Sequence, residues 1–223
     1  MSSSPRRLAI LASGGGTNLQ AIADHLDGLG AASPVTIELV LSDRPESGAL
    51  ERARACGLAA VALPRGNDEA MLEQLERHHI THIALAGYLR LVPLSVVKAY
   101  HGRMLNIHPA LLPAFGGPGM YGRKVHEAVL AAGVRVCGPT VHFVDERYDE
   151  GPIVAQWPVP VREGDTVETL AARVLIAEHR IYPQCVAALC AGTLHLETDG
   201  EVIGAPPFTF TRFVPAEGTD PHT

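Results

Sequence analysis

The chain has 223 residues, with 47% hydrophobic side chains, 19% charged side chains and a formal net charge of −6. That length can bury one good-sized core, and the composition is typical of an ordinary globular protein. The negative charge without a basic block argues against a nucleic-acid partner, and the lack of 18 consecutive apolar residues argues against a membrane span.

The chain opens with a polar, basic segment that leads into a short apolar run. Residues 8–12 are too few for the apolar part of a signal peptide, so we expect a cytoplasmic protein. Residues 7–12 (R-L-A-I-L-A) are continuously apolar after a charged start. This pattern predicts a central strand that is buried on both faces.

A glycine-rich turn follows this strand. The segment Ser13-Gly14-Gly15-Gly16-Thr17-Asn18 leads into a helical pattern that begins at Leu19. Strand, glycine turn and helix in this order bring together backbone N–H groups and the positive end of a helix dipole, which suits a phosphate. The run is neither a P-loop nor a complete G-x-G-x-x-G, and a triple glycine is also compatible with a tight turn alone.

Strands and helices then alternate along the first half of the chain. Further strands are predicted at residues 36–41, 59–63, 82–86 and 104–108. Helices are predicted at residues 49–56, ended by Gly57, at 68–79, capped by Asp68, and at 93–100. Repeated βα units of this length predict an α/β fold with a doubly wound, mostly parallel sheet and helices on both faces.

The second half of the chain is richer in glycine, proline and acidic residues. We expect a glycine-rich loop with the composition of a lid at residues 115–122, followed by a helix at 124–132. A strand at 140–144, an acidic loop at 145–151 and a proline-containing edge or bent strand at 153–161 come next. Thr166 begins a long helix to about Cys190, in which Pro183 should cause a kink or an interruption. We treat residues 1–223 as one domain, with peripheral tails at 1–6 and about 200–223.

One strand end carries two polar side chains on the same face. Because side chains alternate along a strand, Asn106 and His108 point one way while Leu105 and Ile107 point the other. Ligands of open α/β sheets bind where such strands run out into loops. The alternative is a histidine that satisfies a backbone carbonyl and an asparagine that caps a turn.

Three features together indicate chemistry: the glycine-rich turn, the Asn106–His108 pair, and the acidic loop with Asp145 and Asp149. An imidazole, a carboxamide and a carboxylate can move a proton and stabilise an oxyanion. No serine lies in a G-x-S-x-G elbow, so a substrate would supply the nucleophile. Asp145 and Glu146 are interpreted as solvated loop acids, and His126 and His142 as core histidines, although His142 could also line the site.

The cysteines and histidines give no clear metal site. Cys56, Cys137, Cys185 and Cys190 lack close C-x-x-C spacing, so we expect small buried hydrophobic residues. The densest histidine group is His78, His79 and His82, but it lies across a predicted helix end and the following strand, without an H-E-x-x-H pattern. No metal is therefore expected.

Several motifs resemble the 10-formyltetrahydrofolate-dependent formyltransferases. They are N-I-H-P-A-L-L-P at 106–113, G-Y-L-R-L-V at 87–92, T-V-H-F-V at 140–144 and Y-D-E-G-P at 148–152. The segments S-G-G-G-T-N-L-Q at 13–20 and A-E-H-R-I-Y-P at 177–183 are similar to the branch of that family that formylates glycinamide ribonucleotide in purine synthesis. The resemblance covers about residues 7–195, in the family's order.

The resemblance implies a doubly wound sheet, small-molecule substrates and 10-formyltetrahydrofolate as co-substrate. Asn106 and His108 match the family's catalytic pair and Asp149 its aspartate, which should raise the pKa of His108. The matches to glycinamide ribonucleotide-binding positions are Gly16, Thr17, Asn18 and Glu178. The matches to folate-binding positions are Leu89, Arg90, Leu91, Val92 and Asn106.

The chain departs from the family at two places. Gly15 stands where the family often has an asparagine, and its folate-binding arginine has no clear counterpart, since Arg65 is out of register. The rival functions are a formyltetrahydrofolate hydrolase, a formyltransferase for another amine, and a phosphate-binding module with an inactive site. The sequence leaves the oligomeric state open between monomer and homodimer.

Overall fold

A seven-stranded sheet forms the centre of the protein. The structure, a computed structural model, describes residues 6–63 and 68–208. Its strands lie in the order β3-β2-β1-β4-β5-β7-β8. The pairs from β3 to β5 are parallel, and β5–β7 and β7–β8 are antiparallel. The predicted α/β fold with a doubly wound, mostly parallel sheet is therefore confirmed.

The strands of the large sheet begin and end close to the predicted positions. They are β1 (Arg6–Leu11), β2 (Val35–Ser42), β3 (Ala59–Ala62), β4 (His82–Leu85), β5 (Met104–His108), β7 (Thr140–Phe143) and β8 (Ile153–Gln156). Two small antiparallel pairs lie outside it. They are β6 (Val136–Cys137) with β9 (Val159–Pro160), and β10 (His195–Leu196) with β11 (Val202–Ile203).

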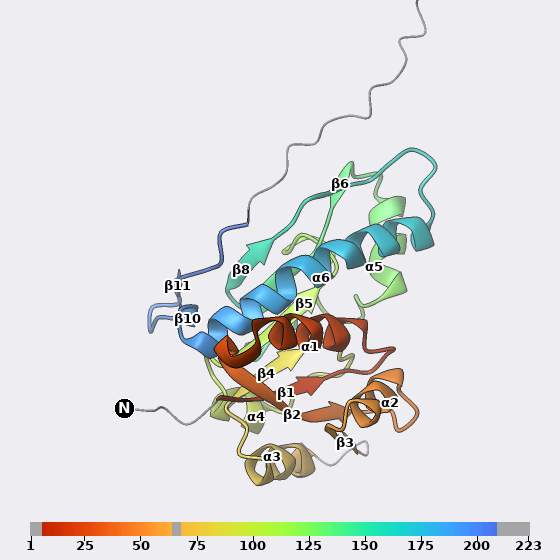
Figure 1. The fold of residues 1–223 in the computed structure, drawn as a ribbon. Helices are drawn as coiled ribbons and strands as arrows, with labels where there is room; N and C mark the ends of the chain where they lie inside the picture. The colour runs from red at the N-terminus through yellow and green to blue at the C-terminus, as the bar shows by residue number, and fades with distance from the viewer. Residues whose placement is uncertain (1–5, 64–67, 209–223) are drawn as a thin grey trace, which may run out of the picture.

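Helices cover both faces of the sheet. The α-helices are α1 (Thr17–Leu29), α2 (Gly48–Ala55), α3 (Asp68–Arg77), α4 (Leu94–Ala99), α5 (Arg123–Ala131) and α6 (Val167–Ala191), and a 3₁₀ turn η1 spans Gly30–Ala32. Figure 1 shows α1 and α6 side by side on one face, where they share a core with Leu105 and Phe143. Helices α3 and α4 pack on the opposite face, against residues such as Leu11 and Met104.

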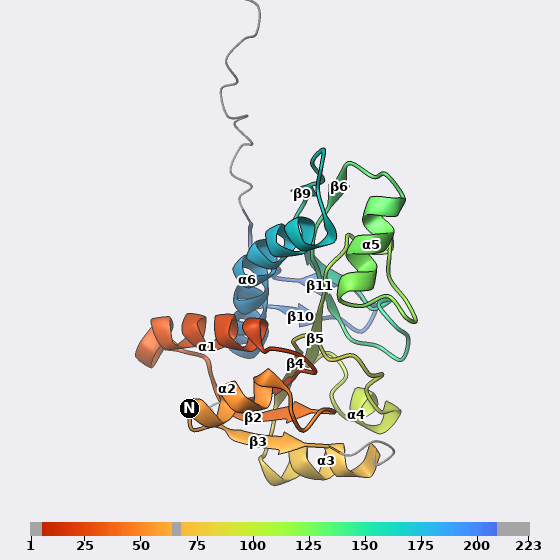
Figure 2. The same ribbon diagram turned by 90° about the vertical axis from the view of Figure 1, so that its right-hand side faces the viewer.

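Helix α5 and the β6–β9 pair lie toward the opposite end of the molecule from β2 and β3 (Figure 2). A third apolar cluster joins α5 to the first half of α6 through Val125, Val129, Leu170 and Val174. The alternating pattern of β5 sends Leu105 and Ile107 toward α6. The side chains of Asn106 and His108 therefore face away from α6, as the sequence predicted.

Several local expectations need correction. Helix α6 continues without a break through Pro183, which is buried against the core. Its start is as predicted, since Thr166 and Thr169 form a reciprocal cap. The predicted strand at 153–161 is divided into β8 and β9, which pair in different sheets, because the chain bends at Trp157 and Pro158.

The remaining corrections concern the surface and the ends. Cys56 is exposed, whereas the other three cysteines are buried as expected. The start of the C-terminal tail is structured, because Val202 and Ile203 pair with β10. The cap predicted at the start of α3 and the unassigned Arg65 lie outside the described residues. None of the helices in the described part combines the length and the apolar character that a membrane crossing needs.

Candidate active site

Asn106 and His108 lie at the end of β5, where the parallel part of the sheet meets the antiparallel part. His108 is 4% exposed, and its Nε2 donates a hydrogen bond to the carbonyl oxygen of Phe115 over 2.8 Å. Residue Asn106 is directly opposite His142 on β7 in the strand register. The two side chains meet there, with Asn106 Nδ2 3.0 Å from His142 Nε2.

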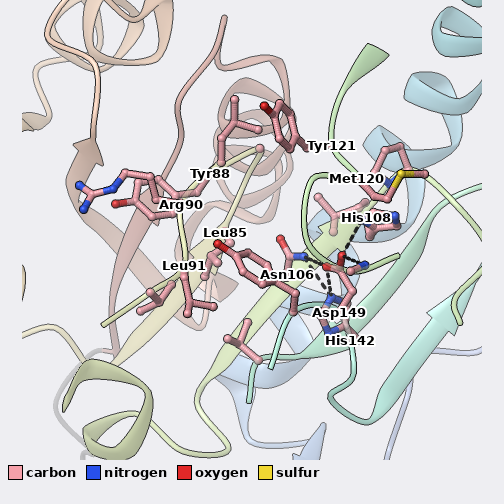
Figure 3. Close-up of a pocket in the computed structure, with 18 of the residues that line it drawn as sticks. Leu85, Tyr88, Arg90, Leu91, Asn106, His108, Met120, Tyr121, His142 and Asp149 are labelled. Atoms are coloured by element: carbon pink, nitrogen blue, oxygen red, sulfur yellow. Dashed lines mark hydrogen bonds and ion pairs between the residues drawn. The ribbon is translucent and has the colours of Figure 1, made fainter. Parts of the chain in front are cut away.

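Asp149 completes this group from the loop before β8. Its Oδ2 lies 3.5 Å from His108 Nδ1, and its Oδ1 lies 3.5 Å from Asn106 Nδ2 and 3.7 Å from His142 Nε2 (Figure 3). The backbone N–H of Gly117 donates to Oδ2 over 2.9 Å. Asp149 has a φ of 55°, a left-handed conformation that aspartate adopts more readily than most residues. The structure thus brings the three predicted catalytic residues together.

Opposing influences set the pKa of His108. Burial favours the neutral imidazole and is the largest influence, so the pKa of His108 lies below its ordinary value. The charge of Asp149 and the Phe115 carbonyl oppose that shift, and His142 adds to it. The predicted upward influence of Asp149 is therefore confirmed, but desolvation outweighs it and the pKa of His108 is lowered overall.

Asp149 remains an anion in this site. Burial opposes its ionisation, but His142, the charge of His108 and the Gly117 N–H together hold the pKa of the Asp149 carboxyl below its usual range. The ring of His108 is placed between two acceptors, the Phe115 oxygen and Asp149. A second proton on His108 would therefore find a partner at each ring nitrogen, which allows an imidazolium to form when negative charge develops nearby.

The first pocket adjoins this group of side chains. It is lined by the predicted folate-binding residues Leu89, Arg90, Leu91, Val92 and Asn106, together with His108, Met120, Tyr121, His142, Tyr148 and Asp149. Apolar side chains make up much of its wall, and Leu91 is 48% exposed at its rim. Such a pocket can hold a flat, largely apolar ligand beside the catalytic group.

A second pocket extends from the glycine-rich turn to α6. Ser13, Gly14, Asn18 and Glu178 line it, and it shares Gly87, Leu89, Ile107, Pro109 and Gly122 with the first pocket. Gly16 has a φ of 76° at the start of α1, where a Cβ atom would lie 2.8 Å from Ala49 Cα. Gly16 therefore lets α2 approach the turn, and neither it nor the exposed Thr17 lines the pocket.

Asn18 and Glu178 join the two long helices across the second pocket. Asn18 Nδ2 donates to Glu178 Oε2 over 2.7 Å, although the residues are 160 positions apart. Burial raises the pKa of Glu178, and the hydrogen bond from Asn18 opposes this rise. The buried Oδ1 of Asn18 has no hydrogen-bond partner. A ligand with hydroxyl groups could satisfy both side chains.

Some site residues were missed or undervalued in the sequence. His142 is buried, as predicted, but it also contacts the catalytic group. Its position opposite Asn106 follows from strand pairing, which the sequence does not show. His126, Arg44 and Arg123 line the second pocket, and Asp145 lines the first. In the described part of the chain, no three His, Cys, Asp or Glu side chains gather as a metal site.

The glycine-rich loop is tied to the catalytic group at two points. Phe115 accepts the hydrogen bond of His108, and Gly117 donates to Asp149. A Cβ atom at Gly116 would lie 2.5 Å from Leu112 Cδ2 and 3.3 Å from Asp149 Cβ. The loop therefore helps to position both catalytic residues, and its action as a lid stays a prediction.

Comparisons with known proteins agree with this site. Residues 6–186 match the family model described as formyl transferase. The chain belongs to the formyl transferase family. This membership confirms the resemblance inferred from the motifs.

Two relatives with similar sequences carry the same name. Phosphoribosylglycinamide formyltransferase of Vigna unguiculata, named as chloroplastic, is 42% identical over 202 residues, which are 87% of this chain and 64% of that protein. The enzyme of the same name from Bacillus subtilis is 38% identical over 191 residues, which are 82% of this chain and 94% of that protein. The chain thus spans just under two thirds of the plant protein and nearly all of the bacterial one.

A solved structure confirms the fold of a formyl transferase. Glycinamide ribonucleotide transformylase 1 from Symbiobacterium toebii matches with a TM-score of 0.82 and 41% identity, covering 91% of this chain and 95% of that chain.

Proposed function

We propose that this enzyme transfers the formyl group of 10-formyltetrahydrofolate to the amine of N1-(5-phosphoribosyl)glycinamide, in purine biosynthesis. The observation that carries this proposal is that the pocket lined by Asn106, His108 and Asp149 adjoins the second pocket, with which it shares Ile107 and Pro109 on either side of His108. A largely apolar pocket suits the folate, and the pocket beside the glycine-rich turn suits the phosphoribosyl group. The formyl carbon and the amine would then meet at the end of β5.

The reaction needs no nucleophile from the protein. The substrate amine attacks the formyl carbon, its electron pair forms the new C–N bond, and the carbonyl oxygen becomes an oxyanion. The protonated ring of His108 and the amide of Asn106 stabilise this charge. Collapse of the intermediate breaks the bond to N10 of the folate, and tetrahydrofolate leaves with a proton.

Asp149 has two tasks in this scheme. Its carboxylate lies 3.5 Å from His108 Nδ1, close enough to stabilise the imidazolium as the oxyanion forms. Its lowered pKa keeps it ionised, so it can accept the proton of the attacking amine, directly or through water. Since burial favours neutral His108, the oxyanion adds to the stabilisation that Asp149 gives the imidazolium.

Substrate binding follows from the second pocket. Gly14 of the turn and Asn18 at the start of α1 line this pocket, where backbone N–H groups and the positive end of the helix dipole would favour a phosphate. This explains how an acidic protein could bind an anionic substrate. Arg44, at the same pocket, adds a positive charge. Glu178 and the unpartnered Oδ1 of Asn18 would accept hydrogen bonds from hydroxyl or amide groups of the glycinamide nucleotide.

The proposal includes the cellular setting. We place the enzyme in the cytoplasm, with small molecules and no nucleic acid as partners, and as a monomer or homodimer. The net charge of −6 supports the absence of a nucleic-acid partner. Light scattering of the purified protein measures the oligomeric state.

A turnover assay with both substrates tests the function. We expect tetrahydrofolate and the formylated nucleotide to appear together, in equal amounts, only when the glycinamide nucleotide is present. Water is the competing acceptor, so a reaction without the amine measures hydrolysis. Release of formate without formyl transfer would refute the proposal and would indicate a formyltetrahydrofolate hydrolase.

A further inference from the structure

Each ring nitrogen of His142 has a hydrogen-bond partner. It is 2% exposed, and its Nδ1 lies 2.8 Å from the carbonyl oxygen of Phe143. A carbonyl oxygen can only accept, so Nδ1 carries a hydrogen and donates it. In a neutral ring the second nitrogen, Nε2, then has a lone pair and acts as an acceptor.

This acceptor fixes the orientation of Asn106. The nitrogen of the Asn106 amide lies 3.0 Å from His142 Nε2 and 3.5 Å from Asp149 Oδ1, so its N–H groups point at these two acceptors (Figure 3). The amide oxygen lies in the same plane and points away from His142 and Asp149. In this orientation Asn106 directs its donors at the protein and has an acceptor left for the pocket.

An oxyanion needs the opposite orientation. Developing negative charge is stabilised by N–H donors, and an amide oxygen facing it would repel it. A half-turn of the carboxamide exchanges its oxygen and nitrogen with little change in shape. After that turn the oxygen faces His142 Nε2, which must then carry a hydrogen. Whether His142 Nε2 carries a hydrogen therefore determines if the oxygen or the nitrogen of the Asn106 amide faces the pocket.

We propose that His142 is a positioning residue that, on taking up a proton at Nε2 from solvent, turns the amide of Asn106 so that its N–H groups face the formyl oxygen. The inference rests on the proposed function. Asp149 stabilises the protonated ring, since its Oδ1 lies 3.7 Å from Nε2. The other titratable groups at this pocket include His108, whose pKa His142 lowers, and Asp145, Arg147 and Tyr148 of the loop before β8. Strand β8 places the apolar Ile153 opposite His142, and α6 covers the other face.

The test compares two substitutions at one position. His142→Phe keeps a flat ring but has no nitrogen, so it cannot hold Asn106 in either orientation. We expect its kcat to fall by about 10-fold or more, toward the 10²-fold loss typical of a missing oxyanion donor, with KM values for both substrates little changed. His142→Gln keeps an amide that can donate to the turned Asn106, and we expect it to recover most of the lost kcat.

A matched control separates positioning from stability. His82→Phe makes the same ring exchange at a buried strand position of β4, outside both pockets, and we expect wild-type kcat from it. Thermal unfolding of all three variants measures the structural cost of each change. Wild-type kcat in His142→Phe, or an equal loss of kcat in His142→Phe and His142→Gln, would overturn the role assigned to His142.

A second measurement does not depend on turnover. In the empty site the side-chain N–H groups of Asn106 are engaged by His142 and Asp149, so their exchange with solvent should be slow in wild-type protein and faster in His142→Phe. NMR with ¹⁵N-labelled asparagine measures this exchange, and Asn106→Asp assigns the signal. Fast exchange in the wild type would refute the positioning role even if the variants fail to fold. Wild-type inactivity with the glycinamide nucleotide would instead refute only the proposed function.

Discussion

Replacement of Asp149 by asparagine removes a charge from between two imidazole rings and keeps the size of the side chain. The carboxylate lies 3.5 Å from His108 Nδ1 and 3.7 Å from His142 Nε2, and its side chain is only 11% exposed. For unit charges 3.5 Å apart, an effective dielectric constant of about 20 gives an attraction of about 5 kcal/mol. The Asp149→Asn variant loses this attraction for the His108 imidazolium.

Only part of that energy reaches the transition state. Burial already holds the pKa of His108 below its ordinary value, so desolvation cancels some of the attraction in the resting enzyme. If about half of it, near 3 kcal/mol, acts when the oxyanion forms, kcat falls by at least about 10²-fold. The KM values should change little, because Asp149 acts on charge that develops after both substrates are bound.

Steady-state kinetics with varied glycinamide nucleotide and varied 10-formyltetrahydrofolate measures both quantities. The matched control is Glu146→Gln, an exposed acid in the same loop that lines neither pocket, and it should keep wild-type kcat. A folded Asp149→Asn variant with kcat close to the wild type would refute the assigned role of the carboxylate. A rise in KM that accounts for the whole loss would show that Asp149 binds substrate instead.

Other substitutions test the remaining parts of the structure. His108→Ala should also lower kcat by at least about 10²-fold with a little-changed Tm, and wild-type turnover would exclude acid–base chemistry at this residue. Glu178→Gln should raise the KM for the nucleotide and stabilise the protein at pH 7 but not at pH 4. A group whose pKa is raised on folding destabilises the fold once pH rises through that value, and urea unfolding at the two pH values checks this sign. Burial lowers the pKa of His82 to about 4, so the free energy of unfolding of the wild type should fall by up to about 3 kcal/mol as the pH falls from 6.5 to 4. The same fall in His82→Gln would contradict this. Thr166→Ala should lower the free energy of unfolding by about 1 kcal/mol through loss of the α6 cap, without effect on kcat.

Local patterns were sufficient to predict most of the fold. Continuous apolar runs located β1 and β4, and Gly57, with a φ of 71°, ends α2 as the sequence indicated. The alternation along residues 104–108 placed Asn106 and His108 on one face. These features depend on neighbours in the sequence, which is why they could be predicted.

Features that depend on distant contacts could not be predicted. The pKa of His108 is set mainly by its burial, and burial is a property of the assembled loops. The role of Gly16 in letting α2 approach the turn depends on Ala49, 33 positions further along the chain. Pro183 was expected to kink or interrupt α6, but the helix is continuous, and burial of Pro183 against the core favours it over local preference.

The hydrogen bond between Asn18 and Glu178 has a consequence for synthesis of the protein. A chain still growing on the ribosome has its glycine-rich turn after the first few dozen residues, but Glu178 lies 160 residues after Asn18. Until α6 has left the ribosome and docked beside α1, the second pocket lacks one wall. A ligand of this pocket therefore cannot act as a template for early folding, because the pocket is complete only when the last long helix packs onto the sheet.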